Sequence, residues 1–155
     1  FQDGLQGEVS MELSSQWGDF ILRRADGVAA YQLAVVVDDG GSGITEVVRG
    51  RDLLSSTPAQ IWLYRQLGLP VPQFFHVPML LSTDGRRLSK RDRDLDLGVL
   101  RQHGTPEEIL GTLAHACGLL DRREPVSARE LSQVFSWDKV QKEDITLDAG
   151  IFLKK

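Results

Sequence analysis

The sequence contains a single cysteine among 155 residues, which excludes an internal disulfide. One thiol also excludes a zinc site made of several cysteines, and the three histidines lack metal-ligand spacing. No apolar run approaches the length of a membrane span, and no secretory leader is recognisable. We therefore expect a cytoplasmic protein that does not bind a membrane and has no metal site in this chain.

A general excess of positive charge is also missing, because the formal net charge is −4. Affinity for nucleic acid must therefore come from a local patch. Hydrophobic residues at 41% and charged residues at 26% are ordinary for a globular domain. The length is sufficient for one hydrophobic core with a small appendage.

Strands and helices alternate in the first half of the chain. Short strands are expected at residues 19–24, 44–48 and 74–81. Thr57 and Pro58 predict a helix start, with Gln60 completing a capping box and Gly68 ending the helix. Residues 31–37 are ambiguous, since β-branched side chains favour a strand while a buried helix turn fits nearly as well. The alternation predicts an α/β fold with a largely parallel sheet.

From about residue 94 onward the pattern predicts helices only. Thr105 and Ser127 each begin a capping box. The first of these helices carries one apolar stripe, which consists of Ile109, Leu110, Leu113, Ala116 and Cys117. Gly118 is expected to end it. The histidines are better explained by packing than by catalysis, His76 as a hydrogen-bonded core residue.

The most informative segment is a basic loop that follows the apolar residues 77–81. Five cations occur within residues 86–93, namely Arg86, Arg87, Lys90, Arg91 and Arg93. Such a run is most often a solvated surface. A basic loop at the carboxyl end of a strand is also well placed to hold a polyphosphate.

Residues 87–91, Arg-Leu-Ser-Lys-Arg, resemble the second signature of class I aminoacyl-tRNA synthetases, written KMSKS. The glutamyl branch usually has Lys-Leu-Ser-Lys-Arg, so Arg87 departs from it. The departure keeps the positive charge but replaces a compact ammonium by a planar fork.

The resemblance to the glutamyl-tRNA synthetase family extends over roughly residues 1–120. Tyr-Gln-Leu-Ala-Val-Val-Val-Asp-Asp at 31–39 is similar to one block of that family, and Ile-Thr-Glu-Val-Val-Arg-Gly-Arg-Asp at 44–52 to the next. Ser-Thr-Pro at 56–58, Leu-Tyr at 63–64 and His-Val-Pro at 76–78 follow in family order. Five separate blocks at family spacing make the match specific.

The resemblance implies a fold as well. Residues 1–82 would be the second half of a Rossmann-type catalytic domain, 83–93 the signature loop, and 94–155 a helical segment that contacts the tRNA stem. It also makes residues 31–39 a helix, and we adopt that interpretation over the propensity for a strand.

The resemblance further implies that Tyr31 and Arg49 bind the amino acid. Glutamate carries two carboxylates, and a guanidinium makes bidentate contacts with them. Without the resemblance, Tyr31 would be interpreted as a core aromatic residue and Arg49 as part of a surface ion pair.

For ATP, supplied with magnesium, the resemblance implies that the backbone at Leu80 and Leu81 holds adenine. The loop would then close on the phosphates. Lys90 would stabilise charge on the α-phosphate and the departing pyrophosphate. The residues expected to touch ATP in this loop are Arg87, Leu88, Ser89, Lys90 and Arg91.

The first class I signature, His-Ile-Gly-His, is absent from the sequence. We therefore expect an upstream half of the catalytic domain, covalent or separate, and no aminoacylation by this polypeptide alone. The end at Lys155 resembles the truncated paralogues that attach glutamate to the queuosine base of tRNA(Asp). An ordinary glutamyl-tRNA synthetase, which attaches glutamate to the tRNA 3′ end, stays open as the alternative.

Two interpretations from other classes stay open. A non-catalytic module would bind RNA or protein through a synthetase-like surface. A generic phosphate-binding α/β domain would bind nucleotides without any preference for glutamate.

Overall fold

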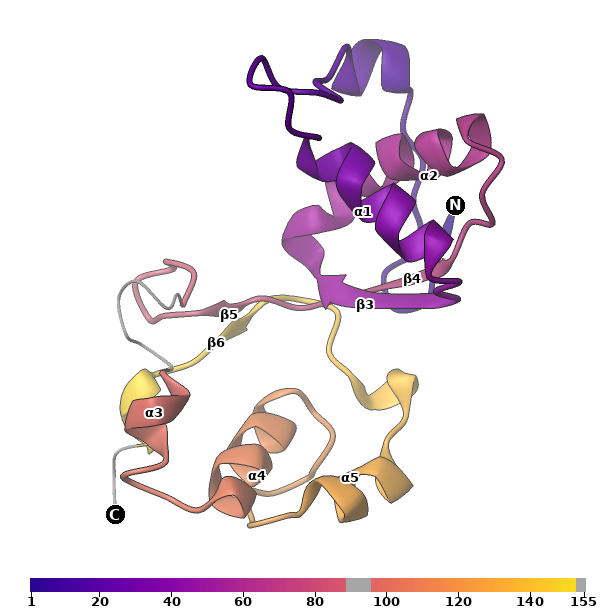
Figure 1. The fold of residues 1–155 in the computed structure, drawn as a ribbon. Coiled ribbons are helices and arrows are strands. Elements are labelled where there is room, and N and C mark those ends of the chain that lie inside the picture. Colours follow the sequence, from indigo (N-terminus) through magenta and orange to yellow (C-terminus); the bar gives the residue numbers. More distant parts are fainter. Residues whose placement is uncertain (89–95, 153–155) are drawn as a thin grey trace. The chain divides into compact units, whose positions relative to one another are not determined.

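The computed structural model describes residues 1–88 and 96–152 (Figure 1). The chain divides into two compact units, Phe1–Val77 and Pro78–Lys155, which we describe separately. Helices and short paired strands occur in both units, which confirms the α/β class. Among the described residues, no helix has the length and apolarity needed to cross a bilayer.

The first unit combines a parallel pair of strands with two packed α-helices. Its elements are β1 Gln2–Asp3, β2 Gly7–Glu8, the π-helix η1 Leu13–Trp17, α1 Tyr31–Gly41, β3 Glu46–Gly50, the 3₁₀ helix η2 Arg51–Ser56, α2 Thr57–Gln66 and β4 Gln73–Val77. Strands β3 and β4 run parallel, with Arg49 opposite His76. The crossover between them contains α2, as expected for parallel strands.

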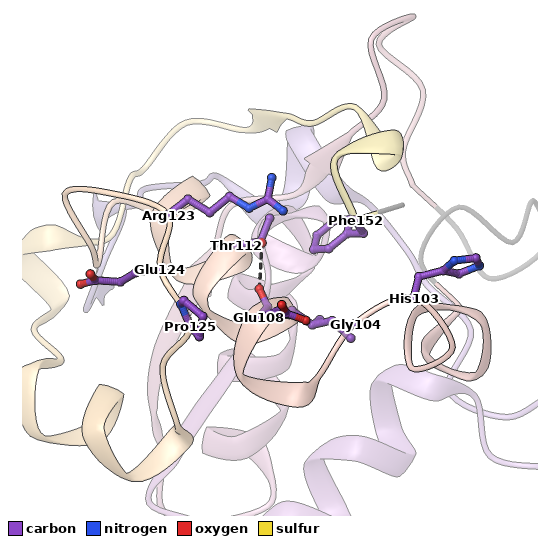
Figure 2. Close-up of a pocket in the computed structure, with 9 residues that line it drawn as sticks. His103, Gly104, Glu108, Thr112, Arg123, Glu124, Pro125 and Phe152 are labelled. Carbon is purple, nitrogen blue, oxygen red and sulfur yellow. Dashed lines mark hydrogen bonds between the residues drawn. The ribbon is translucent and has the colours of Figure 1, made fainter. Parts of the chain in front are cut away.

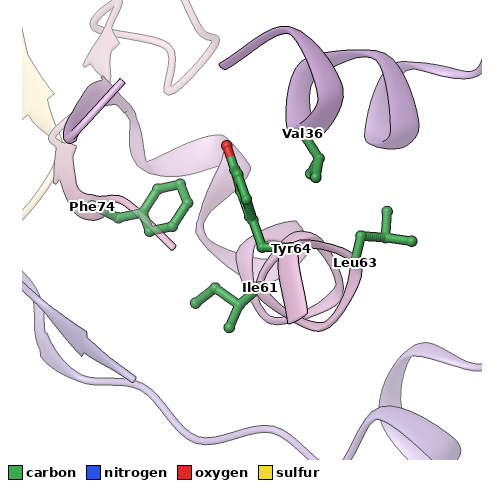
Figure 3. Close-up of a cluster of buried hydrophobic side chains, with 5 residues drawn as sticks. All are labelled: Val36, Ile61, Leu63, Tyr64 and Phe74. Atoms are coloured by element: carbon green, nitrogen blue, oxygen red, sulfur yellow. The ribbon is translucent and has the colours of Figure 1, made fainter. Parts of the chain in front are cut away.

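The core of this unit lies where α1, α2 and β4 meet. Its buried side chains are Val36, Ile61, Leu63, Tyr64 and Phe74 (Figure 3). Val36 is fully buried, and α1 packs on α2. This contact explains why residues 31–41 form the helix implied by the resemblance, since packing of an apolar face overrides the intrinsic strand preference.

Helix α2 begins at Thr57 as predicted, but the expected capping box does not form. The 3₁₀ helix η2 runs directly into α2, and Ser56 occupies the N-cap without a side-chain hydrogen bond. The Thr57 hydroxyl donates instead to the carbonyl of Leu53 at 3.0 Å. Gln60 is 1% exposed and contacts Arg49. Both side chains therefore bond to other partners, and the capping box does not form.

Two strand predictions were wrong. Residues 19–24 form no strand, and only Arg23 makes an isolated bridge, to Ala29. Residues 74–81 form two strands, β4 and β5, rather than one. The interruption falls at Pro78, which has no N–H to donate to a sheet ladder. The strand expected at 44–48 occurs as β3, shifted toward Gly50.

The described residues of the second unit form three α-helices and a short parallel pair of strands. Its elements are β5 Leu80–Leu81, α3 Leu97–Leu100, α4 Pro106–Ala116, α5 Ala128–Val134, the 3₁₀ helix η4 Trp137–Lys139, β6 Ile145–Thr146 and the 3₁₀ helix η5 Ala149–Phe152. Both predicted capping boxes form, at Thr105 and at Ser127. Gly118 has a φ of +84°, and the helix ends just before it as predicted.

The prediction of helices only after residue 94 was wrong, because β6 pairs in parallel with β5. Ile145 and Leu147 are buried, and the Leu147 N–H donates to the carbonyl of Leu81 at 2.7 Å. Two-residue strands give too short a pattern for periodicity to detect.

Candidate functional site

Arg49, at the end of β3, is the centre of a polar cluster in the first unit. Its Nε donates to His76 Nε2 at 3.0 Å. Its Nη2 donates to Thr57 Oγ1 and to Gln60 Oε1, both at 2.7 Å. Its Cζ atom lies 5.0 Å from the centroid of the Phe74 ring. The side chain is therefore fixed by β4 and α2 rather than by the surface ion pair that the isolated sequence suggested.

Tyr31, the first residue of α1, meets Arg49 in this cluster. Burial lowers the pKa of Arg49, while a hydrogen bond and favourable electrostatic interaction with Tyr31 oppose that effect. Tyr31 is 54% exposed, so it is not a core aromatic residue. The structure thus brings together the two residues predicted to bind the amino acid, one of them open to solvent.

Other titratable groups near Arg49 lie on α1 and α2. Burial raises the pKa of the Tyr64 phenol, and the nearby Asp39 carboxylate raises it further. Asp39 also interacts favourably with the Arg49 guanidinium. Gln32 accepts a hydrogen bond from Gln60 Nε2 at 2.6 Å, which extends the cluster to α1.

A buried acid lies behind this cluster. Asp3 Oδ2 is 2.5 Å from His76 Nδ1, and neither side chain is accessible to solvent. Asp3 Oδ1 accepts from the backbone N–H groups of Leu5, Gln6 and His76 at 3.0, 2.8 and 3.2 Å. Burial works against ionisation of Asp3, but these hydrogen bonds together hold its pKa below the usual value.

The predicted interpretation of His76 as a packed, hydrogen-bonded residue is confirmed, since it is 0% exposed. Burial lowers its pKa, although the hydrogen bond to Asp3 acts in the opposite direction. Its ring also stacks on Phe74 with the centroids 6.1 Å apart. His76 thus links the acid of β1 to the arginine of β3.

The residues predicted to hold ATP lie in the second unit, as far as they are described. Leu80 and Leu81 form β5, and the chain then turns back at Gly85, which has a φ of +80°. Leu81 and Arg87 form an antiparallel bridge, and the Leu88 N–H donates to the carbonyl of Leu80 at 3.0 Å. The turn is fixed by Asp84, which accepts from the Ser82 hydroxyl and from the Arg86 N–H.

The backbone of Leu80 and Leu81 has partners among the described residues. The Leu80 carbonyl accepts the Leu88 N–H within the hairpin, and the Leu81 carbonyl accepts the Leu147 N–H just after β6. Ser89, Lys90 and Arg91 lie outside the described residues, and their predicted contacts with phosphate stay predictions.

A pocket of about 250 Å³ also lies in the second unit (Figure 2). Its lining residues are His103, Gly104, Glu108, Ile109, Thr112, Arg123, Glu124, Pro125 and Phe152. The Glu108 carboxylate accepts from the Thr105 N–H at 2.8 Å, and Glu124 pairs with Arg122. None of the predicted site residues that the structure describes lines this pocket.

Sequence reasoning missed Asp3 and misjudged Thr57 and Gln60. Asp3 precedes Gly4 near the start of the chain and looks like an ordinary turn acid. Thr57 and Gln60 have capping-box spacing, so the local pattern favoured a cap. Nothing in the sequence pointed to the polar partner of Gln60, because its burial is visible only in the structure.

Comparison with known proteins assigns the arrangement to a class. Residues 1–149 match the family described as tRNA synthetases class I (E and Q), catalytic domain. The chain therefore belongs to the catalytic-domain family of class I tRNA synthetases for glutamate and glutamine.

Two relatives within this family are named as glutamyl-Q tRNA(Asp) synthetases. The chain is 53% identical over 133 residues to a glutamyl-Q tRNA(Asp) synthetase of Symbiobacterium thermophilum, covering 85% of this chain and 41% of the relative. It is 44% identical over 158 residues to that of Nitratidesulfovibrio vulgaris, covering 100% and 49%. The chain thus spans less than half of these relatives.

A solved structure gives the same family. The fold is similar to a glutamate tRNA ligase from Elizabethkingia meningosepticum, with a TM-score of 0.80 and 28% identity, covering 98% of this chain and 35% of that one. That ligase was crystallised in complex with its amino acid.

Proposed function

We propose that this chain is part of the catalytic domain of an ATP-dependent ligase that activates glutamate as glutamyl-adenylate and transfers it to tRNA. The observation that carries the proposal is the Tyr31–Arg49 cluster, formed in a chain of this family. A protonated guanidinium beside a solvent-exposed phenol is a receptor for a carboxylate. The relatives at 53% and 44% identity favour tRNA(Asp), with the queuosine base as acceptor.

The proposal includes the finer fold. We infer that β3 and β4, joined by a crossover through α2, belong to a Rossmann-type parallel sheet. The parallel register and the likeness to a glutamate tRNA ligase support this inference. The partners in the proposal are glutamate, ATP with magnesium, tRNA, and an upstream half of the catalytic domain.

The reaction follows from the proposed sites. An oxygen of the glutamate α-carboxylate bonds to the α-phosphorus of ATP, and pyrophosphate leaves. Lys90 would stabilise the charge that accumulates on the phosphates in this step. The other residues of the proposed ATP site are Leu80, Leu81, Arg87, Leu88, Ser89 and Arg91.

The test is glutamate-dependent exchange of labelled pyrophosphate into ATP, measured on the protein as encoded around this chain. Lys90→Ala should lower the exchange rate by about a hundredfold, the usual effect of removing one donor to a developing charge. Arg101→Ala removes an exposed cation from the second unit and serves as the matched control. Aspartate and glutamine, tested as substrates, should give no exchange.

Two results would contradict the proposal. Nucleotide binding that shows no dependence on glutamate would favour a generic phosphate-binding domain. Salt-sensitive RNA binding that Lys90→Ala abolishes while ATP affinity is unchanged would favour a non-catalytic module.

A further inference from the structure

The Asp3–His76 pair is not used by the function proposed above, yet it is a fully buried polar contact of the first unit. Asp3 is 1% exposed and His76 is 0% exposed. Burying an acid beside an imidazole is costly unless the hydrogen bonds are satisfied. The pair touches Arg49 directly, through His76 Nε2.

The partners of His76 determine which nitrogen carries the proton. An ionised Asp3 accepts hydrogen bonds only, so Nδ1 must donate across the 2.5 Å contact. Arg49 donates only, so Nε2 must present its lone pair across the 3.0 Å contact. Thr57 Oγ1 also lies 3.0 Å from Nε2 and, as a hydroxyl, fits either tautomer. The contacts with Asp3 and Arg49 therefore specify the same neutral tautomer of His76.

We propose that Asp3 and His76 are positioning residues that orient the Arg49 guanidinium toward the substrate carboxylate. The inference rests on the proposed function. Nε is held by His76, and both N–H groups of Nη2 are held by Thr57 and Gln60. Only the two N–H groups of Nη1 are then left for Tyr31 and a ligand, so the substrate carboxylate meets Nη1 rather than the Nε–Nη2 edge.

Protonation of His76 breaks this arrangement. The charged groups that face the imidazole are Asp3 from β1, Arg49 from β3 and Asp52 from η2. An added proton on Nε2 would point at the Arg49 N–H and place two positive charges side by side. Affinity for glutamate should therefore fall as the pH drops, with unchanged affinity for ATP.

Asp3→Asn changes the tautomer of His76 while keeping the shape of the side chain at position 3. Three backbone N–H groups hold the Oδ1 position, so the new amide oxygen stays there and its NH₂ faces His76 Nδ1. That NH₂ donates, which moves the imidazole proton to Nε2. A donor then faces a donor at Arg49, much as a wrong histidine tautomer disables a catalytic triad.

The experiment has two readouts on the protein that contains this chain. Nitrogen-15 NMR of the labelled imidazole should show the proton on Nδ1 in the wild type and on Nε2 in Asp3→Asn. The KM for glutamate should rise about tenfold in Asp3→Asn, the effect of one lost charge-assisted hydrogen bond, with kcat changed less. Asp26→Asn, in an exposed ion pair with Arg24, is the matched control.

His76→Gln keeps the proposal testable if Asp3→Asn does not fold. A glutamine carbonyl can accept from Arg49 Nε but does not titrate near neutral pH. This variant should recover most of the glutamate affinity that His76→Ala loses. It should also remove the rise in KM at low pH, which a merely structural role of His76 would leave in place.

The outcomes distinguish the inference from the function on which it rests. A wild-type imidazole protonated on Nε2 overturns the inference whatever the substrate. A shifted proton with unchanged KM for glutamate overturns it and leaves the proposed function standing. A folded wild type without any glutamate dependence overturns the function, and the inference with it.

Discussion

The two units use their polar side chains in opposite ways. In the first unit the polar contacts are buried and join distant segments, since Asp3 and His76 are 73 residues apart and Arg49 and His76 are 27 apart. In the second unit the clearest polar contacts are exposed capping boxes that span three residues. One unit fixes the Arg49 side chain through its tertiary structure, while the other starts its helices through local hydrogen bonds.

The difference teaches where a substitution will be felt. Loss of an exposed cap affects one helix, and water can hydrogen-bond to the groups that the cap leaves without a partner. A member of the Arg49 cluster acts on several elements at once, and the partners it leaves behind stay buried. We therefore expect the largest effects in the first unit.

Arg49→Ala should have the largest effect. It removes the donor to Thr57 Oγ1 and Gln60 Oε1 and leaves His76 Nε2 with the Thr57 hydroxyl alone, at 3.0 Å. Each buried unsatisfied group costs about 1–3 kcal/mol. We expect the free energy of unfolding to fall by about 3 kcal/mol. Urea denaturation, followed through the amide signals of β3 and β4, measures it.

The control for this prediction is Arg65→Ala, which removes an exposed arginine from α2. It should change the stability by no more than about 0.5 kcal/mol. Equal losses in the two variants would mean that the cluster around Arg49 does not stabilise the unit.

Gly111→Ala should have the next effect, and it lies in the second unit. A Cβ at this position would be 1.8 Å from the backbone carbonyl oxygen of Glu124. Backbone must move to relieve that overlap, at a cost of about 2 kcal/mol. Thermal unfolding monitored by the amide signals of α4 measures it.

Gly41→Ala is the matched comparison, because nothing lies within 4 Å of its Cβ position in α1. Alanine favours a helix over glycine, so this variant should be neutral or stabilising by up to about 1 kcal/mol. A destabilisation equal to that of Gly111→Ala would show that the close contact with Glu124 is not the cause of the loss.

A smaller difference between the two units should appear in how their stability depends on pH. Burial lowers the pKa of His76 from its ordinary value of 6.5. The unfolded chain then binds the proton first as the pH drops, so the stabilising contribution is complete above pH 6.5 and declines below it. The expected slope is about 1.4 kcal/mol per pH unit for one proton, continuing until the folded His76 titrates.

His76→Gln should remove this slope, as measured by urea denaturation of the first unit from pH 7 to 5 (an interval set by the histidine value of about 6.5). The lowered pKa of Asp3 affects a more acidic interval, below its ordinary value of 3.8. A slope that survives in His76→Gln would have to come from other groups and would contradict the assignment.

The smallest effect belongs to the caps. Thr105→Ala removes the oxygen that accepts from the Glu108 N–H at 3.3 Å. We expect a loss of about 1 kcal/mol, confined to the second unit. Thr105→Ser retains the hydroxyl and should restore most of it, as hydrogen exchange of the α4 amides would report.

These contrasts also explain what the sequence could predict. Helix α4 was predicted with its capping box and its end at Gly118, because each signal lies within a few residues of its partner. The box at Thr57 was wrong because the partner of Gln60 is Arg49, on another strand. Local patterns contain no information about a competitor that arrives through tertiary folding.

The residues of the candidate site likewise differ in whether the sequence carried any signal of them. Tyr31 and Arg49 were predicted through the family resemblance, and the structure places them in contact. Asp3 had no local signal, since its partner is His76 at the far end of the unit. The role of Lys90 stays a prediction, because the residue lies outside the described part of the chain.

The separation between Asp3 and His76 has a consequence for how the first unit can be divided. Closing a loop of this length costs chain entropy, and this cost arises before the contact can stabilise the fold. The contacts of Asp3 and Arg49 with His76 therefore form only after the two ends of this segment have come together. Grafting the proposed carboxylate receptor onto another scaffold with these contacts would require the whole segment from Asp3 to His76.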